Sequence, residues 1–154
     1  MNYFKGLLVA VIAVLSFGFA QTETYTFADP AHSFVYYKVN YGNFGRELGR
    51  FNAFDYTIVR DTADLSKSTI EFSVDATSMD SGIDKSNQDI SGPDFLNVAE
   101  FPTITFKSTS IKDMGDGNLE VTGDLTVRGT TKPVTTTVEY IGEGEGGQGE
   151  YRVG

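Results

Sequence analysis

The sequence predicts an all-β fold with one short helix, and two observations indicate it. Apolar and polar residues alternate with period two over several segments, of which 119–128 is the longest. Gly, Pro and Asp-Gly turn signals separate these segments, and one stretch, 79–100, is polar and lacks the alternation. Period two places every second side chain on the same face of a strand, so each segment needs a sheet in which its apolar face is buried.

The first twenty residues have the layout of a secretory signal peptide. Lys5 precedes an apolar run over 6–17, and the small residues Gly18 and Ala20 stand before Gln21. A transmembrane anchor is the alternative, but the run is shorter than the ~20 apolar residues needed to cross a bilayer. We predict cleavage after Ala20, a single domain over 21–154, and a periplasmic or secreted protein.

Composition excludes several classes of function. The chain has 21 acidic and 12 basic residues, a net charge of −9 that becomes more negative when Lys5 is removed with the leader. Such a charge repels phosphate backbones and anionic membrane surfaces, so we predict no nucleic-acid partner. There is no Cys, and His32 is the single histidine; this excludes thiol chemistry and multi-histidine metal sites. Asp29 and Ser33 lie too close to His32 in sequence to form a catalytic triad on an extended chain. We predict no enzymatic activity, no cofactor and no metal.

Seven strands are expected in chain order. Phe51 and Phe54 are three residues apart, which breaks the alternation and predicts a bulge near Asn52-Ala53. Asp116-Gly117 predicts the turn of a hairpin between the fifth and sixth strands. The expected strands cover 25–27, 33–41, 50–59, 68–77, a segment beginning at 104, 119–128 and 134–140.

Residues 83–90 are expected to form the helix, and 93–98 a loop that tucks Phe95 or Leu96 under one end of a barrel. Seven strands do not close an up-and-down barrel, because the first and last strands are antiparallel neighbours only when the count is even. The chain stops at 151–154, where a further strand would begin. We therefore expect a barrel that lacks its C-terminal strand or strands, with an open edge beside the first or last strand.

Two strings resemble ligand-binding motifs and are better explained as loops or turns. Gly144, Gly146 and Gly149 match a dinucleotide fingerprint, but no helical pattern follows and neighbouring glutamates would repel a pyrophosphate. Asp113, Asp116 and Asn118 resemble part of a calcium loop, but the spacing differs from that of an EF-hand and no bidentate Glu is in place. Acids scattered over outward strand positions are typical of a solvated surface rather than a glycosidase.

Five segments carry a resemblance to a known family. PDFLNV (93–98), FPTITFKSTS (101–110) and GDLTVRGTTKPV (123–134), together with ADPAHSFV (28–35) and GRFNAF (49–54), resemble the YceI-like family of bacterial secreted proteins. The resemblance covers nearly all of the chain after the leader. It implies a lipocalin-like, antiparallel, eight-stranded β-barrel whose lumen binds polyisoprenoids or other long-chain lipids, for storage, transport or stress response, and a possible homodimer.

With that resemblance, the inward positions become candidate ligand contacts. An eight-stranded barrel is the size at which side chains either fill the interior or leave room for one slender ligand. A filled barrel that acts as a partner-binding or stress-related surface protein is the alternative. Tyr41, and the run from Ser86 to Ile90, stand where the family tends to carry imidazole or basic groups, so a neutral head group is favoured over a pyrophosphate. The candidate lumen residues are Val35, Tyr37, Phe51, Phe54, Phe72, Val74, Phe95, Ile104, Phe106, Val121, Leu125 and Val138.

Overall fold

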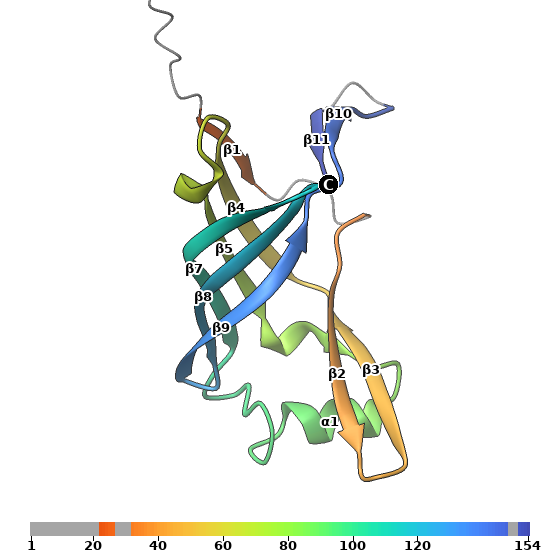
Figure 1. Cartoon of the computed structure of the whole chain (residues 1–154). Helices are drawn as coiled ribbons and strands as arrows, with labels where there is room; N and C mark the ends of the chain where they lie inside the picture. Colours follow the sequence, from red (N-terminus) through yellow and green to blue (C-terminus); the bar gives the residue numbers. More distant parts are fainter. Residues whose placement is uncertain (1–21, 27–31, 148–150) are drawn as a thin grey trace, which may run out of the picture.

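A computed structural model describes residues 22–26, 32–147 and 151–154. Its main feature is a curled, six-stranded antiparallel sheet in the order β1-β4-β5-β7-β8-β9 (Figure 1). The sheet is not closed into a complete barrel: β1 and β9 are its two edges. Its strands are β1 (Thr22–Thr26), β4 (Phe54–Asp61), β5 (Thr69–Asp75), β7 (Thr103–Gly115), β8 (Asn118–Val127) and β9 (Thr130–Glu139).

A smaller unit lies at one end of this sheet. It consists of a three-stranded sheet in the order β2-β3-β6 and the helix α1, which packs beside the β2–β3 hairpin (Figure 1). A two-stranded sheet, β10-β11, lies at the opposite end. The bounds are β2 (Val35–Tyr41), β3 (Gly45–Phe51), β6 (Met79–Asp80), α1 (Asp84–Ser91), β10 (Glu143–Glu145) and β11 (Tyr151–Val153), with 3-10 turns η1 (Leu65–Lys67) and η2 (Ala76–Ser78).

The helix predicted over 83–90 is confirmed with a shift of one residue. Asp84 in its first turn is favourably placed at the positive end of the helix dipole. Gly92 ends the helix, with its N–H bonded to the carbonyl of Asp89, and Ile90 is the buried residue. No helix among the described residues is both long and apolar enough to span a bilayer.

The break in the alternation between Phe51 and Phe54 is confirmed, but its cause is a corner between two sheets rather than a bulge. The expected strand over 50–59 is divided: β3 pairs with β6, and β4 pairs with β5. Ser78 fastens the corner, because its Oγ accepts hydrogen bonds from the N–H groups of Asn52 (3.1 Å) and Ala53 (2.9 Å). Both phenylalanines can therefore face the interior.

The predicted hairpin is confirmed. Asp116 (φ 52°) and Gly117 (φ 78°) have the left-handed conformations that a tight turn between β7 and β8 requires. A side chain at Gly117 would also collide with the carbonyl oxygen of Tyr140, 2.7 Å from an added Cβ. The Asp113 carboxylate accepts a hydrogen bond from the Gly115 N–H (2.8 Å), so the aspartates of the suspected calcium loop belong to the turn.

The expected number of strands is wrong. The described residues contain eleven strands, because β3, the two-residue β6 and the short pair β10-β11 were missed and the first strand lies at 22–26 rather than 25–27. Gly144, expected in a loop, lies in β10; Gly149 lies outside the described residues. The leader also lies outside them.

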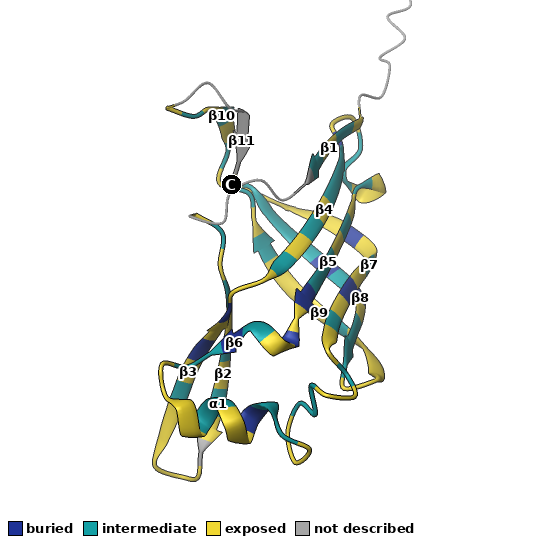
Figure 2. Cartoon of the chain, turned by 180° about the vertical axis from the view of Figure 1, so that it is seen from behind, coloured by how far each residue is buried: buried dark blue, intermediate teal, exposed yellow. Residues whose placement is uncertain are grey.

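Buried residues form two clusters that meet at Phe72. The first cluster joins both sheets and α1, and it is built on Phe51, Val74, Ala76, Met79 and Ile90. The second belongs to the curled sheet and is built on Phe106, Ile111 and Val121. Phe72 packs against both. Figure 2 shows the buried positions along the strands of the curled sheet and near the junction of β3 with β6.

Candidate functional site

The apolar inner face of the curled sheet is the candidate site. Its centre is a pair of stacked rings, Phe72 on β5 and Phe106 on β7, with centroids 5.1 Å apart. Gly123 on β8 allows this arrangement, since an added Cβ would collide with the Phe106 ring. All the predicted lumen residues except Phe95 belong to one of the two clusters or pack against them.

Phe95 belongs to neither cluster and does not pack against them. It is 50% exposed and borders a small cavity of about 140 Å³ beside Val39 and Ile90. Leu96 packs against the first cluster instead. The reason is the turn after α1: the Leu96 N–H bonds to the Ile90 carbonyl (2.9 Å) and Asn97 is left-handed (φ 50°), which directs Leu96 inward.

A cavity of about 270 Å³ opens on the inner face at the end nearest the β7–β8 turn; we call it the turn-end cavity. Apolar side chains from β4, β5, β7, β8 and β9 converge on it. Because each comes from the inward-facing row of its strand, the cavity continues the apolar face on which Phe72 and Phe106 stack. Its apolar lining includes Ile58, Leu65, Ile70, Ile111, Leu119 and Val138.

Arg60 lies at the rim of this cavity and is surrounded by partners. Its guanidinium is 3.0 Å from the Glu143 carboxylate and 3.6 Å from Glu23, and it lies 4.8 Å from the centroid of the Tyr140 ring. The Tyr25 hydroxyl donates to Glu23 (2.6 Å), and this bond is the main cause of its raised pKa. Burial opposes the charge of Arg60, but Tyr140 and Glu143 hold its pKa above the ordinary value. The rim therefore presents a neutralised cation.

The smaller unit, at the other end of the curled sheet, contains two buried oxygens without a hydrogen-bond partner among the described residues, Tyr37 Oη on β2 and Glu47 Oε1 on β3. The other oxygen of Glu47 accepts from the Ser86 hydroxyl of α1 (3.0 Å). The Tyr37 ring lies over Gly49, where a larger residue would collide with it. Burial and the nearby Glu47 carboxylate raise the Tyr37 pKa; the Ser81 hydroxyl is near but bonds to Asn87 (2.8 Å).

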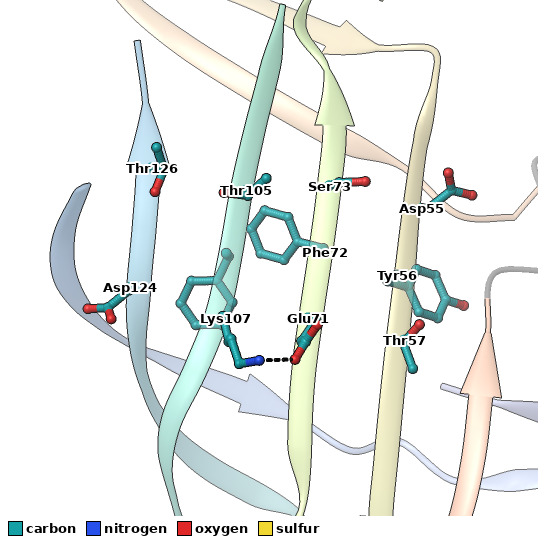
Figure 3. A pocket seen from close by; sticks show the side chains of 11 residues that line it. Asp55, Tyr56, Thr57, Glu71, Phe72, Ser73, Thr105, Lys107, Asp124 and Thr126 are labelled. Carbon is teal, nitrogen blue, oxygen red and sulfur yellow. Dashed lines mark ion pairs between the residues drawn. The ribbon is translucent and has the colours of Figure 1, made fainter. Parts of the chain in front are cut away.

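A hollow of about 450 Å³ lies against β4, β5, β7 and β8 and is lined mainly by outward-facing polar residues (Figure 3). Strand register aligns them in two rows across the sheet. In one row the Lys107 ammonium lies 2.7 Å from Glu71, and this bond raises the Lys107 pKa. Rows of exposed hydroxyl and charged groups are typical of a solvated face, so this hollow is not the candidate site. The first row consists of Asp55, Ser73, Thr105 and Thr126, and the second of Thr57, Glu71, Lys107 and Asp124.

The sequence-based selection missed most of the turn-end cavity. Ile70 and Leu119 show the correct alternation and could have been chosen on that signal. Ile111 could not, because register shifts after Ser108 interrupt the alternation on β7. No pattern in the sequence indicates that Arg60 belongs to the site, since its partners Glu23 and Glu143 come from distant segments. No group of three or more His, Asp or Glu among the described residues is arranged to hold a metal ion.

Comparisons with known proteins agree on one family. Residues 25–153 match a family model described as YceI-like domain. An UPF0312 protein of Vibrio cholerae is 37% identical over 150 residues, which cover 96% of this chain and 79% of that protein. The structure of BcnA from Burkholderia cenocepacia is similar with a TM-score of 0.71 and 28% identity, over 76% of this chain and 73% of that one. The Campylobacter jejuni YCEI protein has the same fold, with a TM-score of 0.65, 20% identity and coverage of 82% and 74%.

Proposed function

Because this chain belongs to the YceI-like family, we propose that it is an exported binding protein that holds a polyisoprenoid or another long-chain amphiphile on its apolar inner face. The turn-end cavity is the observation that carries the proposal. Its lining combines six aliphatic side chains with polar residues of the β7–β8 turn, and it opens on an inner face whose centre is the Phe72–Phe106 stack. The protein is a carrier or store rather than an enzyme.

Burial of the hydrocarbon chain would supply the affinity. Each methylene removed from water contributes about 0.8 kcal/mol, so a segment of several methylenes offsets the cost of immobilising a flexible ligand. The cavity of about 270 Å³ accommodates part of such a chain. The remainder would lie along the inner face toward the first cluster, where Phe72 joins the two ends.

The polar groups at the ends of the inner face favour a ligand with a neutral head group. At the turn end, Arg60 is already paired with Glu143 and Glu23, so it has no free charge for a phosphate. At the other end, Glu47 would repel one. A neutral head group meets neither obstacle: an alcohol or an amide can donate a hydrogen bond to the Glu47 carboxylate, and a quinone carbonyl can accept one from the Tyr37 hydroxyl.

Mass spectrometry of an organic extract tests this proposal. Protein purified from a native bacterial host should release a long-chain neutral lipid in stoichiometric amount, and a Val138→Phe variant should release much less because the larger ring occupies the turn-end cavity. A Thr137→Phe variant, on an exposed neighbouring position of β9, serves as the matched control and should retain the lipid. An extract of the wild type without stoichiometric lipid would favour the alternative of a filled barrel that binds a protein partner.

A further inference from the structure

The β2–β3 hairpin has one face covered by α1 and one face exposed. On the covered side, Glu47 bonds to Ser86 of the helix, and Ile90 belongs to the same cluster as the hairpin residue Phe51. On the other side, alternate positions of both strands are exposed, and no described element packs over them. We call this exposed side, with the turn, the hairpin face; it comprises Phe34, Tyr36, Lys38, Asn40, Phe44, Arg46, Leu48 and Arg50.

Large apolar side chains are concentrated on the hairpin face. Phe44, in the turn between the strands, is 93% exposed, and Tyr36 and Leu48 are 66% and 65% exposed. Phe34 stacks on Tyr36 with ring centroids 5.9 Å apart, so the aromatic groups form a continuous patch at the base of the hairpin. Exposed apolar groups gathered on one face mark an interaction surface, whereas isolated ones do not.

The charge of this face is opposite to that of the protein. Lys38, Arg46 and Arg50 point outward, and the single acid of the hairpin, Glu47, points to the inner face. None of the three cations forms an ion pair within the described part of the chain, although Asp80 lies opposite Arg50 in the register of β3 and β6. The whole chain carries a net charge of −9. Positive groups are therefore in excess on the hairpin face itself, whereas Asp84 and Asp89 lie on α1, on the covered side.

We propose that the hairpin face docks on an anionic lipid bilayer, with Phe44 entering the interfacial region and the three cations contacting lipid phosphates. Aromatic and aliphatic residues beside Lys and Arg are the composition that binds such interfaces. The net charge by itself predicts repulsion from an anionic membrane, but the field of a distant acid is screened within about 8 Å at physiological salt. The negative remainder of the surface then orients the protein with this hairpin toward the bilayer.

A bilayer fits this face better than a folded protein does. The most exposed apolar residue is at the tip of a turn, where a fluid interface can enclose it from all sides. A protein partner would need a matching pocket for Phe44 and acids placed opposite three separated cations. The inference goes beyond lipid binding on the inner face and does not depend on it, because no residue of the hairpin face lines the turn-end cavity.

Co-sedimentation with vesicles tests the proposal. The exported form beginning at Gln21 is used throughout, because the apolar leader would itself enter vesicles. It should bind vesicles containing phosphatidylglycerol at low salt and bind phosphatidylcholine vesicles weakly. Arg46→Glu should reduce binding about 25-fold, since it removes one attraction and adds one repulsion. Lys132→Glu, at an exposed position of β9 outside the hairpin face, is the matched control and should reduce it only slightly.

A fluorescent reporter locates the contact. The chain contains no tryptophan, so Phe44→Trp introduces a single one at the tip of the hairpin. Its emission should shift to the blue and be quenched by brominated lipid when phosphatidylglycerol vesicles are added. Ile141→Trp, at an exposed apolar position in the segment between β9 and β10, should show neither change. Circular dichroism melts verify that each variant is folded.

Three results would overturn the proposal. The first is equal binding to neutral and anionic vesicles by all variants. The second is a blue shift in the Ile141→Trp variant but none in the Phe44→Trp variant. The third is no vesicle binding together with a homodimer that Arg46→Glu dissociates in analytical ultracentrifugation, which would assign the hairpin face to a second copy of the chain. Retention of extractable lipid by Arg46→Glu would show that docking and cargo binding are separate.

Discussion

Replacing Val121 and Val138, each in turn, by Phe distinguishes a packed interior from a ligand-binding one. Both valines are on the inner face of the curled sheet, on the neighbouring strands β8 and β9. Val121 is only 1% exposed and lies at the centre of the second cluster, whereas Val138 is half-buried and lines the turn-end cavity. The same substitution therefore meets a filled space at one position and an open one at the other.

The expected effects on stability differ in size. Overpacking a close-packed site costs about 1–3 kcal/mol, and Val121 should fall in the upper part of that range because its surroundings leave no room for a ring. At Val138 the ring can enter a cavity of about 270 Å³ and gain apolar burial, so the free energy of unfolding should change by less than about 1 kcal/mol. The order of the two variants should be reversed for ligand binding: Val138→Phe should lose more bound lipid than Val121→Phe.

Two measurements on the same preparations decide the matter. Urea denaturation gives the free energy of unfolding, and mass spectrometry of extracts gives the lipid bound per protein. Melts should be made on delipidated protein, because bound ligand itself stabilises the folded state. If Val138→Phe destabilises as strongly as Val121→Phe, or if it keeps its lipid, the turn-end cavity is not a ligand site.

Three further outcomes are expected. Tyr37→Phe should leave stability unchanged or raise it slightly, measured by thermal melting of delipidated protein, since it removes a buried hydroxyl without a partner among the described residues; a loss of several degrees would show that Tyr37 Oη is paired. Ser78→Ala should lower stability by about 1–2 kcal/mol in urea, because the corner at Asn52 and Ala53 loses its side-chain bonds, and an unchanged midpoint would contradict this. The pKa of Asp80 is lowered, first by the hydrogen bond from the Gly82 N–H and then by Asn87. The contribution of Asp80 to the stability of the folded state is therefore complete above the ordinary Asp pKa and is lost as pH falls through the lowered value. Asp80→Asn should thus be less stable than wild type at neutral pH, with a difference in melting temperature that shrinks in acid; a difference independent of pH would refute the assignment.

Local pattern was sufficient for most strands of the curled sheet and for the direction of most of their side chains. Alternation around Phe72 and Phe106 placed both on the inner face, where they stack, and the Asp116-Gly117 turn followed from the conformations that those residues tolerate. The family resemblance, which rests on short segments such as 101–110, was also present in the sequence and is confirmed by the comparisons. These features depend on neighbours a few residues apart, so they can be recognised without a tertiary structure.

Tertiary structure decided the features that depend on distant segments. The spacing of Phe51 and Phe54 is the same for a bulge and for a corner, and only the pairing of β3 with β6 and β4 with β5 distinguishes them. The neutralisation of Arg60 requires Glu143, 83 residues away. Net charge is a sum over the whole chain and does not say where each charge lies on the folded surface. The net charge of this sequence therefore predicts repulsion from anionic membranes, although the fold places three cations on one hairpin face. Which face of a strand is apolar follows from residue order, but what that face meets depends on contacts that only folding creates.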